Sequence, residues 1–323
     1  MLDQYGRVIN YLRISVTDRC NLRCCYCMPE GVQDVGMKNI LTFEEIWEIV
    51  RTGVSLGITH IRITGGEPLV RKGCVDLIRG IREIPGVETI TMTTNGVLLG
   101  NYAKQLKEVG VDSVNISLDT LDPEEFYKIT GKRELQEVLA GIRAAKTTGL
   151  QVKLNAVNRK ELDPLPLVRY AQKENLPLRF IEMMPVGYGK KYVGRSNEEL
   201  RKTLATVCGN PECITDREEL SRMGSGPAVY YRFSDLKVPV GFISAIHGKF
   251  CDTCNRIRLT AEGYLKLCLC YDKGADLRRA LREGEKENLR TIMEETIFQK
   301  PAAHCFEHPA EMTETHEMIK IGG

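Results

Sequence analysis

The chain reads YLRISVTDRCNLRCCYC from Tyr11 to Cys27. A short apolar, β-branched run therefore passes directly into a loop whose thiols follow the spacing C-x3-C-x2-C, at Cys20, Cys24 and Cys27. Thiolates select soft metals, so the expected occupant is zinc or an iron–sulfur cluster. A structural zinc site normally closes with four ligands, whereas three ligands leave one position open for chemistry. Cys25 is an extra thiol beside the pattern, and as a fourth ligand it would close a zinc loop.

Outward from this loop, short apolar runs alternate with amphipathic, helix-like stretches as far as about residue 184. The expected strands are Tyr11–Ser15, Thr59–Ile63, Thr89–Thr93, Ser113–Ser117, Val152–Ala156 and Arg179–Glu182. The expected helices lie near 42–56, 73–83, 98–109, 134–148 and 163–174. Such alternation predicts βα units around a parallel sheet. Six strands are too few for the usual eight-stranded barrel, so we expect an α/β fold with an open, partial (β/α)6 TIM-like barrel.

Polar motifs fall at or just past the carboxyl ends of these strands. They are TGGEP at 64–68, TTNG at 93–96, SLD at 117–119 and EMM at 182–184. Barrel enzymes build their active sites at this rim, and the first cysteine loop is expected to open on it. The motifs are thus candidate site residues.

The alternation fades after about residue 185, where glycines and prolines become frequent. A second cysteine group follows at Cys251, Cys254 and Cys268, with Cys270 close behind. We therefore expect a barrel core at 1–185 and a C-terminal region at 186–323. This region would close the barrel mouth and hold a second metal centre. A zinc knuckle closed by Cys270 is the alternative at this group.

The composition narrows the class of protein. Among 323 residues, 42% are apolar and 27% are charged, as in a globular protein. The net charge of +2 gives no reason to expect a nucleic-acid partner. No apolar run approaches the roughly 18 residues of a membrane span, so a cytoplasmic location is expected. Twelve cysteines in so long a cytoplasmic chain indicate metal binding more than disulfides.

Several separated motifs together resemble one family. They are LRISVTDRC at 12–20, RITGGEP at 62–68, TTNG at 93–96, NISLD at 115–119, RFIE at 179–182, CNRIRLT at 254–260 and the terminal Gly322-Gly323. The sequence resembles the GTP 3′,8-cyclase family, also called molybdenum cofactor biosynthesis protein A. These are radical S-adenosylmethionine (SAM) enzymes that begin molybdenum cofactor biosynthesis. The cysteine loop alone would indicate only the radical SAM superfamily.

The resemblance implies a role for each matching residue. It implies a first 4Fe–4S cluster on Cys20, Cys24 and Cys27, and a second on Cys251, Cys254 and Cys268 whose open iron meets guanine. The implied SAM contacts are Tyr26, Gly66, Ser117 and Met184. The implied GTP contacts are Arg13, Arg62, Thr93, Lys153, Arg256, Ile257 and Arg258. Arg256 and Arg258 are also expected to serve catalysis, together with Gly322 and Gly323 of a tail that reaches the active site.

The implied reaction converts GTP to (8S)-3′,8-cyclo-7,8-dihydroguanosine 5′-triphosphate. It begins with removal of the ribose C3′ hydrogen by a 5′-deoxyadenosyl radical. The implied partners are an external electron donor, a second copy in a homodimer, and a cyclic pyranopterin monophosphate synthase that receives the product. Two rival functions are a peptide-modifying radical SAM enzyme and a zinc-stabilised binding module. Four further thiols are expected to be ordinary, at Cys74, Cys208, Cys213 and Cys305.

Overall fold

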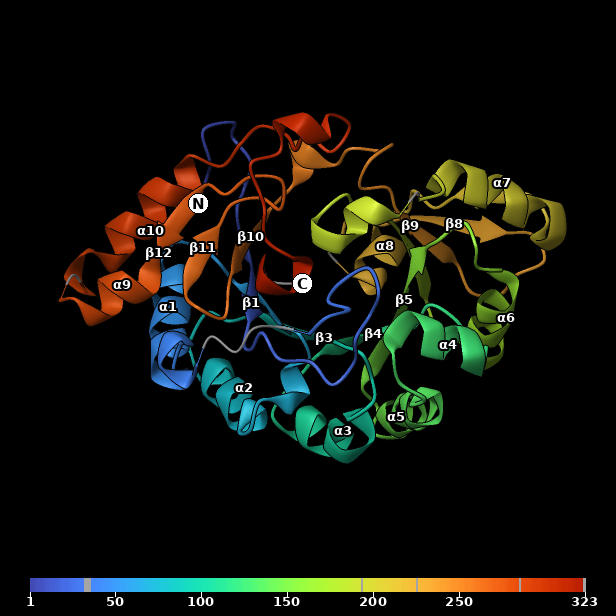
Figure 1. Ribbon diagram of the computed structural model, residues 1–323, viewed down its shortest axis with the longest axis horizontal. Helices are drawn as coiled ribbons and strands as arrows, with labels where there is room; N and C mark the ends of the chain where they lie inside the picture. The colour runs from blue at the N-terminus through green and yellow to red at the C-terminus, as the bar shows by residue number, and fades with distance from the viewer. Residues whose placement is uncertain (32–35, 193, 225, 285, 322–323) are drawn as a thin grey trace.

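The computed structural model describes residues 1–31, 36–192, 194–224, 226–284 and 286–321 (Figure 1). Its strands form one twelve-stranded sheet in the order β12-β11-β10-β1-β2-β3-β4-β5-β6-β9-β8-β7. The six expected strands are all present, as β1 (Tyr11–Ser15), β2 (His60–Thr64), β3 (Thr89–Thr94), β4 (Ser113–Ser117), β5 (Gln151–Asn158) and β6 (Leu178–Glu182). They pair in parallel and in chain order, as βα units predict.

Helices follow the strands and lie along the outside of the sheet (Figure 1). The five expected ones are α1 (Phe43–Ser55), α2 (Cys74–Arg82), α3 (Leu99–Glu108), α5 (Leu135–Thr147) and α6 (Leu165–Glu174). Thr42 caps α1 in a capping box with Glu45. A sixth helix, α4 (Pro123–Thr130), was not expected. Within the described residues, no helix combines the length and the apolar character needed to cross a membrane.

Two strands from the C-terminal region extend the parallel sheet beyond the six. They are β10 (Arg256–Leu259), which pairs with β1, and β9 (Val240–Ile243), which pairs with β6. The remaining strands flank them antiparallel, as β11 (Tyr264–Lys266) with β12 (Gly274–Asp276), and β8 (Val229–Phe233) with β7 (Pro211–Cys213). In the described sheet β12 and β7 are the two edges, which confirms the open, partial barrel. The C-terminal helices are α7 (Asn197–Cys208), α8 (Arg217–Met223), α9 (Leu277–Arg282) and α10 (Leu289–Phe298).

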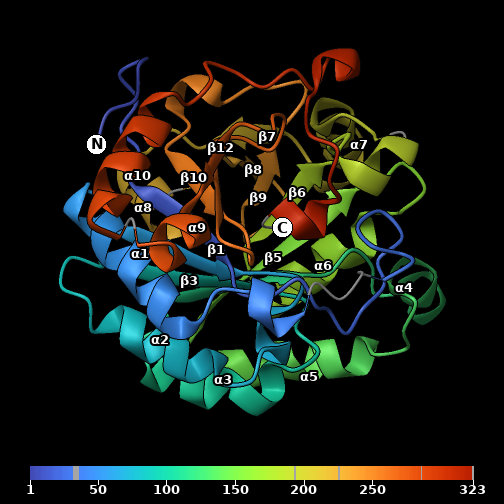
Figure 2. The same cartoon turned by 60° about the vertical axis from the view of Figure 1, so that its left-hand side comes forward.

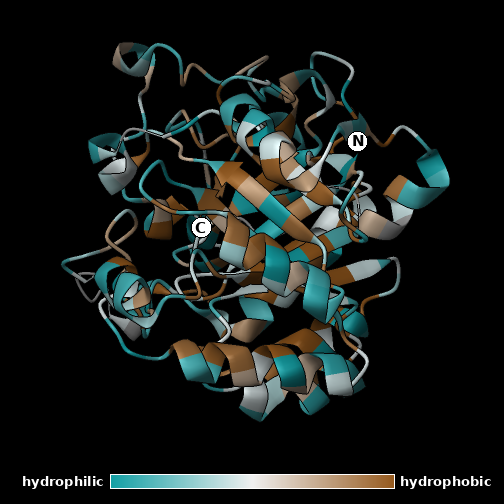
Figure 3. Cartoon of the chain, turned by 90° about the vertical axis from the view of Figure 1, so that its right-hand side faces the viewer, coloured by the Kyte–Doolittle hydropathy of each residue, from teal (hydrophilic) through white to brown (hydrophobic). Residues whose placement is uncertain are grey.

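Successive side chains along the strands point to opposite faces, and this alternation separates core from site. On β1, Leu12 and Ile14 are fully buried in the hydrophobic core, whereas Arg13 between them lines the barrel interior. Hydrophobic segments accordingly run along the strands and the adjoining helices, and hydrophilic ones predominate in the peripheral loops (Figure 3). The sheet thus presents polar side chains to the barrel interior from several neighbouring strands.

The C-terminal turn η7 (Met318–Ile321) lies within the ring of strands and not at its periphery (Figures 1 and 2). Ile319 and Ile321 are buried there. Gly322 and Gly323, to which the resemblance gives a catalytic role, lie outside the described residues. The proposed boundary between a core at 1–185 and a C-terminal region at 186–323 stays a prediction, because β9 and β10 join both parts into one sheet.

Candidate active site

A cavity of about 320 Å³ occupies the barrel interior. Both cysteine groups and residues from several strands form its wall. Of the residues singled out from the sequence, the cavity is lined by Arg13, Tyr26, Cys27, Arg62, Thr93, Ser117, Met184, Cys251, Cys254, Arg256, Arg258 and Cys268. Most of the predicted SAM and GTP contacts therefore face one chamber, whose wall also includes thiols of both cysteine groups.

Five of the predicted site residues that the structure describes do not line the cavity. Cys20, Cys24 and Gly66 belong to the loops that support it. Lys153 is buried on β5, where its Nζ donates a hydrogen bond to the Met223 carbonyl at 2.8 Å. Ile257 is fully buried in the hydrophobic core between sheet and helices, so its side chain points away from the cavity. Only its backbone remains for the predicted nucleotide contact.

The first cysteine loop is held by the unexpected helix α4. The backbone N–H of Arg23 donates to the Thr130 carbonyl at 2.7 Å, and that of Cys25 donates to the Ile129 carbonyl at 2.8 Å. These carbonyls at the end of α4 have no partner within the helix and accept from the loop instead. Within the loop, the Cys24 carbonyl accepts from the N–H of Cys27 at 2.9 Å. Cys24 and Cys27 are thereby carried on one tight turn.

The thiols of this loop suit a positively charged cluster. Burial raises the pKa of Cys20 to about 11 and that of Cys27 to about 12, so a thiolate there requires a cationic partner. The Cys25 thiol lies beside the Tyr192 hydroxyl and raises the pKa of Tyr192 to about 12. The arrangement therefore disfavours a zinc loop closed by Cys25.

A buried carboxyl connects the TGGEP and TTNG motifs. Glu67 accepts hydrogen bonds from the Thr94 hydroxyl at 2.8 Å and from the Asn95 N–H at 2.7 Å. The Asn95 side chain in turn donates to the Cys20 sulfur at 3.7 Å and to Asn21 at 2.8 Å. Burial raises the pKa of Glu67 to about 7. The sequence contained both motifs, but nothing in it indicated that Glu67 would support Cys20 through Asn95.

Gly66 lies where the TGGEP loop touches the cysteine loop. A Cβ atom at this position would overlap the Arg19 carbonyl oxygen and lie 2.8 Å from Cδ1 of Ile319. The backbone of Gly66 also donates to the Thr17 carbonyl at 2.8 Å. Two backbones therefore approach each other closely here, and the C-terminal turn covers them, because glycine has no side chain.

Gly66→Ala is expected to lower the unfolding free energy of the apoprotein by about 3 kcal/mol, the upper range for inserting a methyl group into a packed site. It is also expected to weaken SAM binding, because the cysteine loop must shift. Urea denaturation and equilibrium dialysis with SAM measure the two effects. Gly149→Ala is the matched control for the binding measurement, since no atom lies within 4 Å of a Cβ there. Unchanged SAM binding by Gly66→Ala would contradict the role of this close contact.

Tyr26 is held in place by Asp119, in the loop that follows β4. Its hydroxyl donates to Oδ2 of Asp119 at 2.7 Å, and Oδ1 of Asp119 accepts from the Val157 N–H at 2.8 Å. Burial raises the pKa of both Tyr26 and Asp119. Asp119 also lines the cavity, although sequence reasoning gave it no role. Its position after Ser117, in a rim motif, was the signal available.

Basic side chains from three neighbouring strands lie side by side. The register aligns Arg258 of β10 with Arg13 of β1, and Arg13 with Arg62 of β2. Burial and the charges of Arg258 and Arg62 lower the pKa of Arg13, while burial and the charge of Arg256 lower that of Arg258 to about 10. Crowded like charges favour a polyanion such as a triphosphate. The buried Thr93 hydroxyl has no hydrogen-bond partner among the described residues, and it also faces this cavity.

The second cysteine group begins at the short turn η4 (Cys251–Thr253). Burial alone raises the pKa of the Cys254 thiol, but the charges of Lys300 and Arg256 outweigh it and lower the pKa to about 7. Nη2 of Arg256 donates to the Cys254 sulfur at 3.9 Å. This thiol is therefore prepared to bind metal as a thiolate.

Cys270 does not join the second group. Its sulfur lies 2.7 Å from that of Cys305, in a small core beside the C-terminal turn. Because Cys270 faces Cys305, the structure disfavours a zinc knuckle that Cys270 would close. Cys305 is therefore half of a buried thiol pair, while Cys74 and Cys208 are buried and Cys213 is exposed.

The C-terminal turn closes the chamber near the first cysteine loop. Met318 lines the cavity, and Ile319 packs where the TGGEP loop meets the cysteine loop, with its Cδ1 2.8 Å from the place of a Cβ at Gly66. Glu182 at the end of β6 accepts from the N–H groups of Ile246 at 2.8 Å and of His247 at 3.1 Å. The carboxyl end of β6 is thereby tied to the segment that leads into the second cysteine group.

Comparison with known proteins identifies the family of the chain. Residues 14–162 match the family model of the radical SAM superfamily, and residues 176–306 match that of molybdenum cofactor synthesis C. The chain is 43% identical over 330 residues to a GTP 3′,8-cyclase of Clostridium perfringens (strain SM101 / Type A), covering 100% of both chains. It is 45% identical over 336 residues to a GTP 3′,8-cyclase of Peptoclostridium acidaminophilum, covering 100% of this chain and 98% of that protein.

Among solved structures, the fold is similar to that of Streptococcus suis SuiB bound to S-adenosylmethionine. The TM-score is 0.67 at 13% identity, with 97% of this chain and 77% of that chain covered. At that identity the likeness shows the fold alone.

Proposed function

Since the chain belongs to the GTP 3′,8-cyclase family of radical SAM enzymes, we propose that it converts GTP to (8S)-3′,8-cyclo-7,8-dihydroguanosine 5′-triphosphate, the first step of molybdenum cofactor biosynthesis. Membership of the radical SAM superfamily implies SAM and a 4Fe–4S cluster as cofactors. The observation that carries the proposal is that thiols of both cysteine groups line the same cavity. Four arginines predicted to contact the nucleotide line it as well: Arg13, Arg62, Arg256 and Arg258.

Cys20, Cys24 and Cys27 would hold the first cluster, and the donor set and the tight loop fit it. Three thiols leave one iron free for SAM, and the close packing of Gly66 on the Arg19 carbonyl would hold this predicted SAM contact beside the cysteine loop. Tyr26, Ser117 and Met184 line the cavity beside Cys27 and would contact the cofactor. When bound, cluster and SAM supply a 5′-deoxyadenosyl radical.

Cys251, Cys254 and Cys268 would hold a second 4Fe–4S cluster with an open iron toward guanine. The support is a second set of three thiols on the cavity wall, with Cys254 kept acidic by Lys300 and Arg256. Arg13, Arg62 and Arg258 would bind the triphosphate, since planar guanidinium groups donate two hydrogen bonds to phosphate at once. Thr93, Lys153, Arg256 and the Ile257 backbone complete the proposed substrate contacts.

These residues would fix the nucleotide so that its ribose C3′ and guanine C8 are adjacent. Hydrogen is removed from C3′, the C3′ radical adds to C8, and one electron and one proton complete the dihydropurine product. Holding both carbons in reach is a proximity problem, and a rigid arginine set is suited to it. The C-terminal turn, whose Met318 lines the cavity, is proposed to exclude water from it. Gly322 and Gly323, which follow it, are proposed to assist cyclisation.

Anaerobic incubation with GTP, SAM and a reductant tests the proposal. We expect 5′-deoxyadenosine and a cyclised nucleotide to form in equal amounts, and neither to form without GTP beyond slow uncoupled cleavage. A peptide-modifying enzyme would form no cyclised nucleotide. Two zinc ions per chain with little iron or sulfide, after oxygen-free purification, would overturn both cluster assignments. A chain truncated before Gly322 should keep its clusters and lose cyclisation.

Lys153 should make GTP binding depend on pH. Burial, with the charges of Arg179 and Arg62, lowers the pKa of Lys153 to about 8 in the nucleotide-free protein. A bound triphosphate favours the cation and raises that pKa, so binding takes up a proton above about pH 8. GTP affinity should then fall toward tenfold per pH unit between about pH 8 and 9.

Calorimetric titration with GTP in the absence of SAM measures this dependence. In Lys153→Met we expect a lower GTP affinity without this dependence on pH. Ionisation of the nucleotide would affect wild type and variant alike, so the comparison distinguishes the two causes. The same slope in wild type and Lys153→Met would contradict the proposed contact.

Partners complete the proposal. The reaction needs electrons from an external donor, and a cyclic pyranopterin monophosphate synthase would consume the product. We place the enzyme in the cytoplasm as a homodimer. Size measurement by light scattering tests the dimer.

A further inference from the structure

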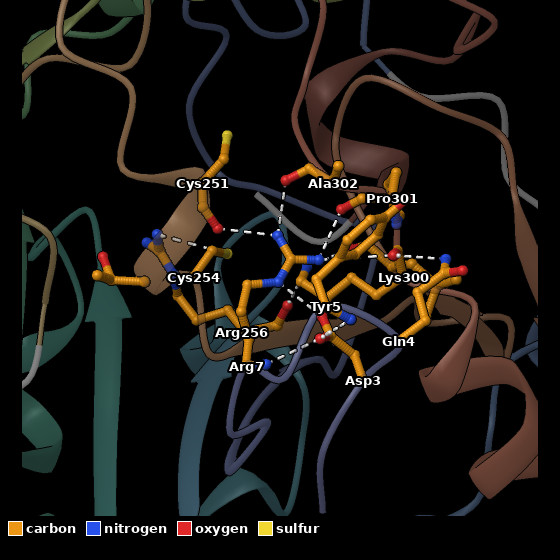
Figure 4. Close-up of polar contacts among 12 residues, drawn as sticks. Asp3, Gln4, Tyr5, Arg7, Cys251, Cys254, Arg256, Lys300, Pro301 and Ala302 are labelled. Atoms are coloured by element: carbon orange, nitrogen blue, oxygen red, sulfur yellow. Dashed lines mark hydrogen bonds and ion pairs between the residues drawn. The ribbon is translucent and has the colours of Figure 1, made fainter.

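Arg7 lies at the centre of a buried set of hydrogen bonds next to the second cysteine group (Figure 4). It is 8% exposed. Its Nη1 donates to the Cys251 carbonyl at 2.8 Å and to the Ala302 carbonyl at 2.7 Å. Its Nη2 donates to the Pro301 carbonyl at 2.7 Å. One guanidinium therefore joins the N-terminal segment, the first cysteine of the second group, and the 300–302 segment.

Asp3 holds this guanidinium in place. Oδ2 of Asp3 accepts from Nε of Arg7 at 2.6 Å, and Oδ1 accepts from the backbone N–H groups of Tyr5 at 3.0 Å and Arg7 at 2.9 Å. Asp3 is 3% exposed, so the ion pair is formed away from water. A buried pair of this kind fixes geometry because either partner alone would be an uncompensated charge.

The 300–302 segment, which Arg7 holds, contacts the rest of the second cysteine group through Lys300. Nζ of Lys300 donates to the Arg256 carbonyl at 2.8 Å and to the Leu267 carbonyl at 2.5 Å. These two carbonyls lie in the residues that follow Cys254 and precede Cys268. Lys300 lines the cavity, and its charge lowers the Cys254 pKa. Each cysteine of the second group therefore lies within two residues of a backbone carbonyl that accepts a hydrogen bond from Arg7 or Lys300, or itself carries that carbonyl.

We propose that Arg7 is a positioning residue for the second cysteine group: through the Cys251 carbonyl and the 300–302 segment it fixes the spacing of Cys251, Cys254 and Cys268. The inference deepens the proposed function, because it rests on those three thiols holding the second cluster. Replacing a residue that hydrogen-bonds to a metal ligand typically lowers metal affinity by 10- to 100-fold.

The chemistry requires arginine at this position. Only a planar fork with separate N–H donors can bond the Asp3 carboxylate and several carbonyls in different directions at once. A lysine keeps the positive charge beside Asp3 but has one nitrogen to serve all of these acceptors. Arg7→Lys therefore retains the ion pair and removes the positioning.

The test isolates the second group. In a chain with Cys20, Cys24 and Cys27 replaced by alanine, only the second group remains to take up a cluster. Arg7→Lys and Arg7→Met are introduced into this background and into its reciprocal, in which Cys251, Cys254 and Cys268 are alanine. Arg282→Lys is the matched control, because Arg282 also donates to carbonyls, those of Lys38 and Ile40, away from both groups. Iron retention is measured by competition with a chelator.

A second readout needs no cluster. In the apoprotein, alkylation of Cys251 by a maleimide is followed by peptide mass spectrometry, with exposed Cys213 as the internal reference. Cys251 is 9% exposed while its turn is held. Release of the turn in the Arg7 variants should speed its alkylation relative to Cys213, whereas Arg282→Lys should not.

We expect both Arg7 variants to weaken iron retention by the second group by roughly 10-fold or more, with no change in the reciprocal background. An equal loss in both backgrounds, or none in either, would overturn the proposal. If the second group holds no iron even with Arg7 present, the proposed second cluster fails. Alkylation then decides the role of Arg7: faster modification of Cys251 supports positioning, and an unchanged rate refutes it.

Discussion

Cys24→Ser is expected to abolish reductive cleavage of SAM, while Cys25→Ser, one residue later, leaves it nearly intact. Cys24 is half-buried at the turn of the first loop, and its carbonyl orders Cys27 through a hydrogen bond of 2.9 Å. On the proposed assignment, the loss of Cys24 leaves two thiols, which are too few to retain the cluster. We expect 5′-deoxyadenosine formation to fall by about 1,000-fold or more, the scale on which members of one catalytic unit act.

Cys25→Ser is the matched control because the two thiols are adjacent in sequence but differ in surroundings. The Cys25 thiol lies beside the Tyr192 hydroxyl, and a serine hydroxyl can occupy the same place. Its effect on activity should stay within about twofold. Iron and sulfide are measured on the same samples. Loss of metal in Cys25→Ser equal to that in Cys24→Ser would show that Cys25 is a ligand, as in a zinc loop.

The strands of the barrel core were predictable because their signal is local. β1 and β4 were located to the residue, since buried parallel strands form short apolar runs bounded by turn residues. Helix α4 carries a local signal as well, in Asp122 as N-cap and Pro123 in the first turn, and that signal was missed. Once formed, α4 supplies the carbonyls that hold the first cysteine loop.

Strands β9 and β10 were not predictable in the same way. Each is four residues long, and their parallel partners β6 and β1 are distant in sequence. This pairing is what brings Arg258 beside Arg13 and places both cysteine groups on one cavity. Residue types and spacing thus indicated the candidate ligands. The supporting contacts of Glu67, Asp119 and Arg7 depend on tertiary packing, and no sequence pattern predicts them.

Arg258→Met is expected to weaken GTP binding by roughly 100-fold, or ~3 kcal/mol, as for other buried charge contacts that lose one partner. Arg258 lines the cavity next to Arg13, and a methionine keeps its bulk without its charge or donors. The binding loss should shrink as salt is raised, because salt screens the attraction that the variant lacks. Titration of GTP in the absence of SAM, at two salt concentrations, measures it.

The same variant should not lose stability without nucleotide, and this separates a binding role from a structural one. Burial and the charge of Arg256 lower the pKa of Arg258 to about 10, so the folded protein holds this cation at a cost. We expect nucleotide-free Arg258→Met to unfold at an equal or higher urea concentration than wild type. Arg143→Met, an exposed change on α5, should alter neither property. Weaker GTP binding accompanied by earlier unfolding would instead make Arg258 a structural residue, and the triphosphate would have to be held by Arg13 and Arg62 without it.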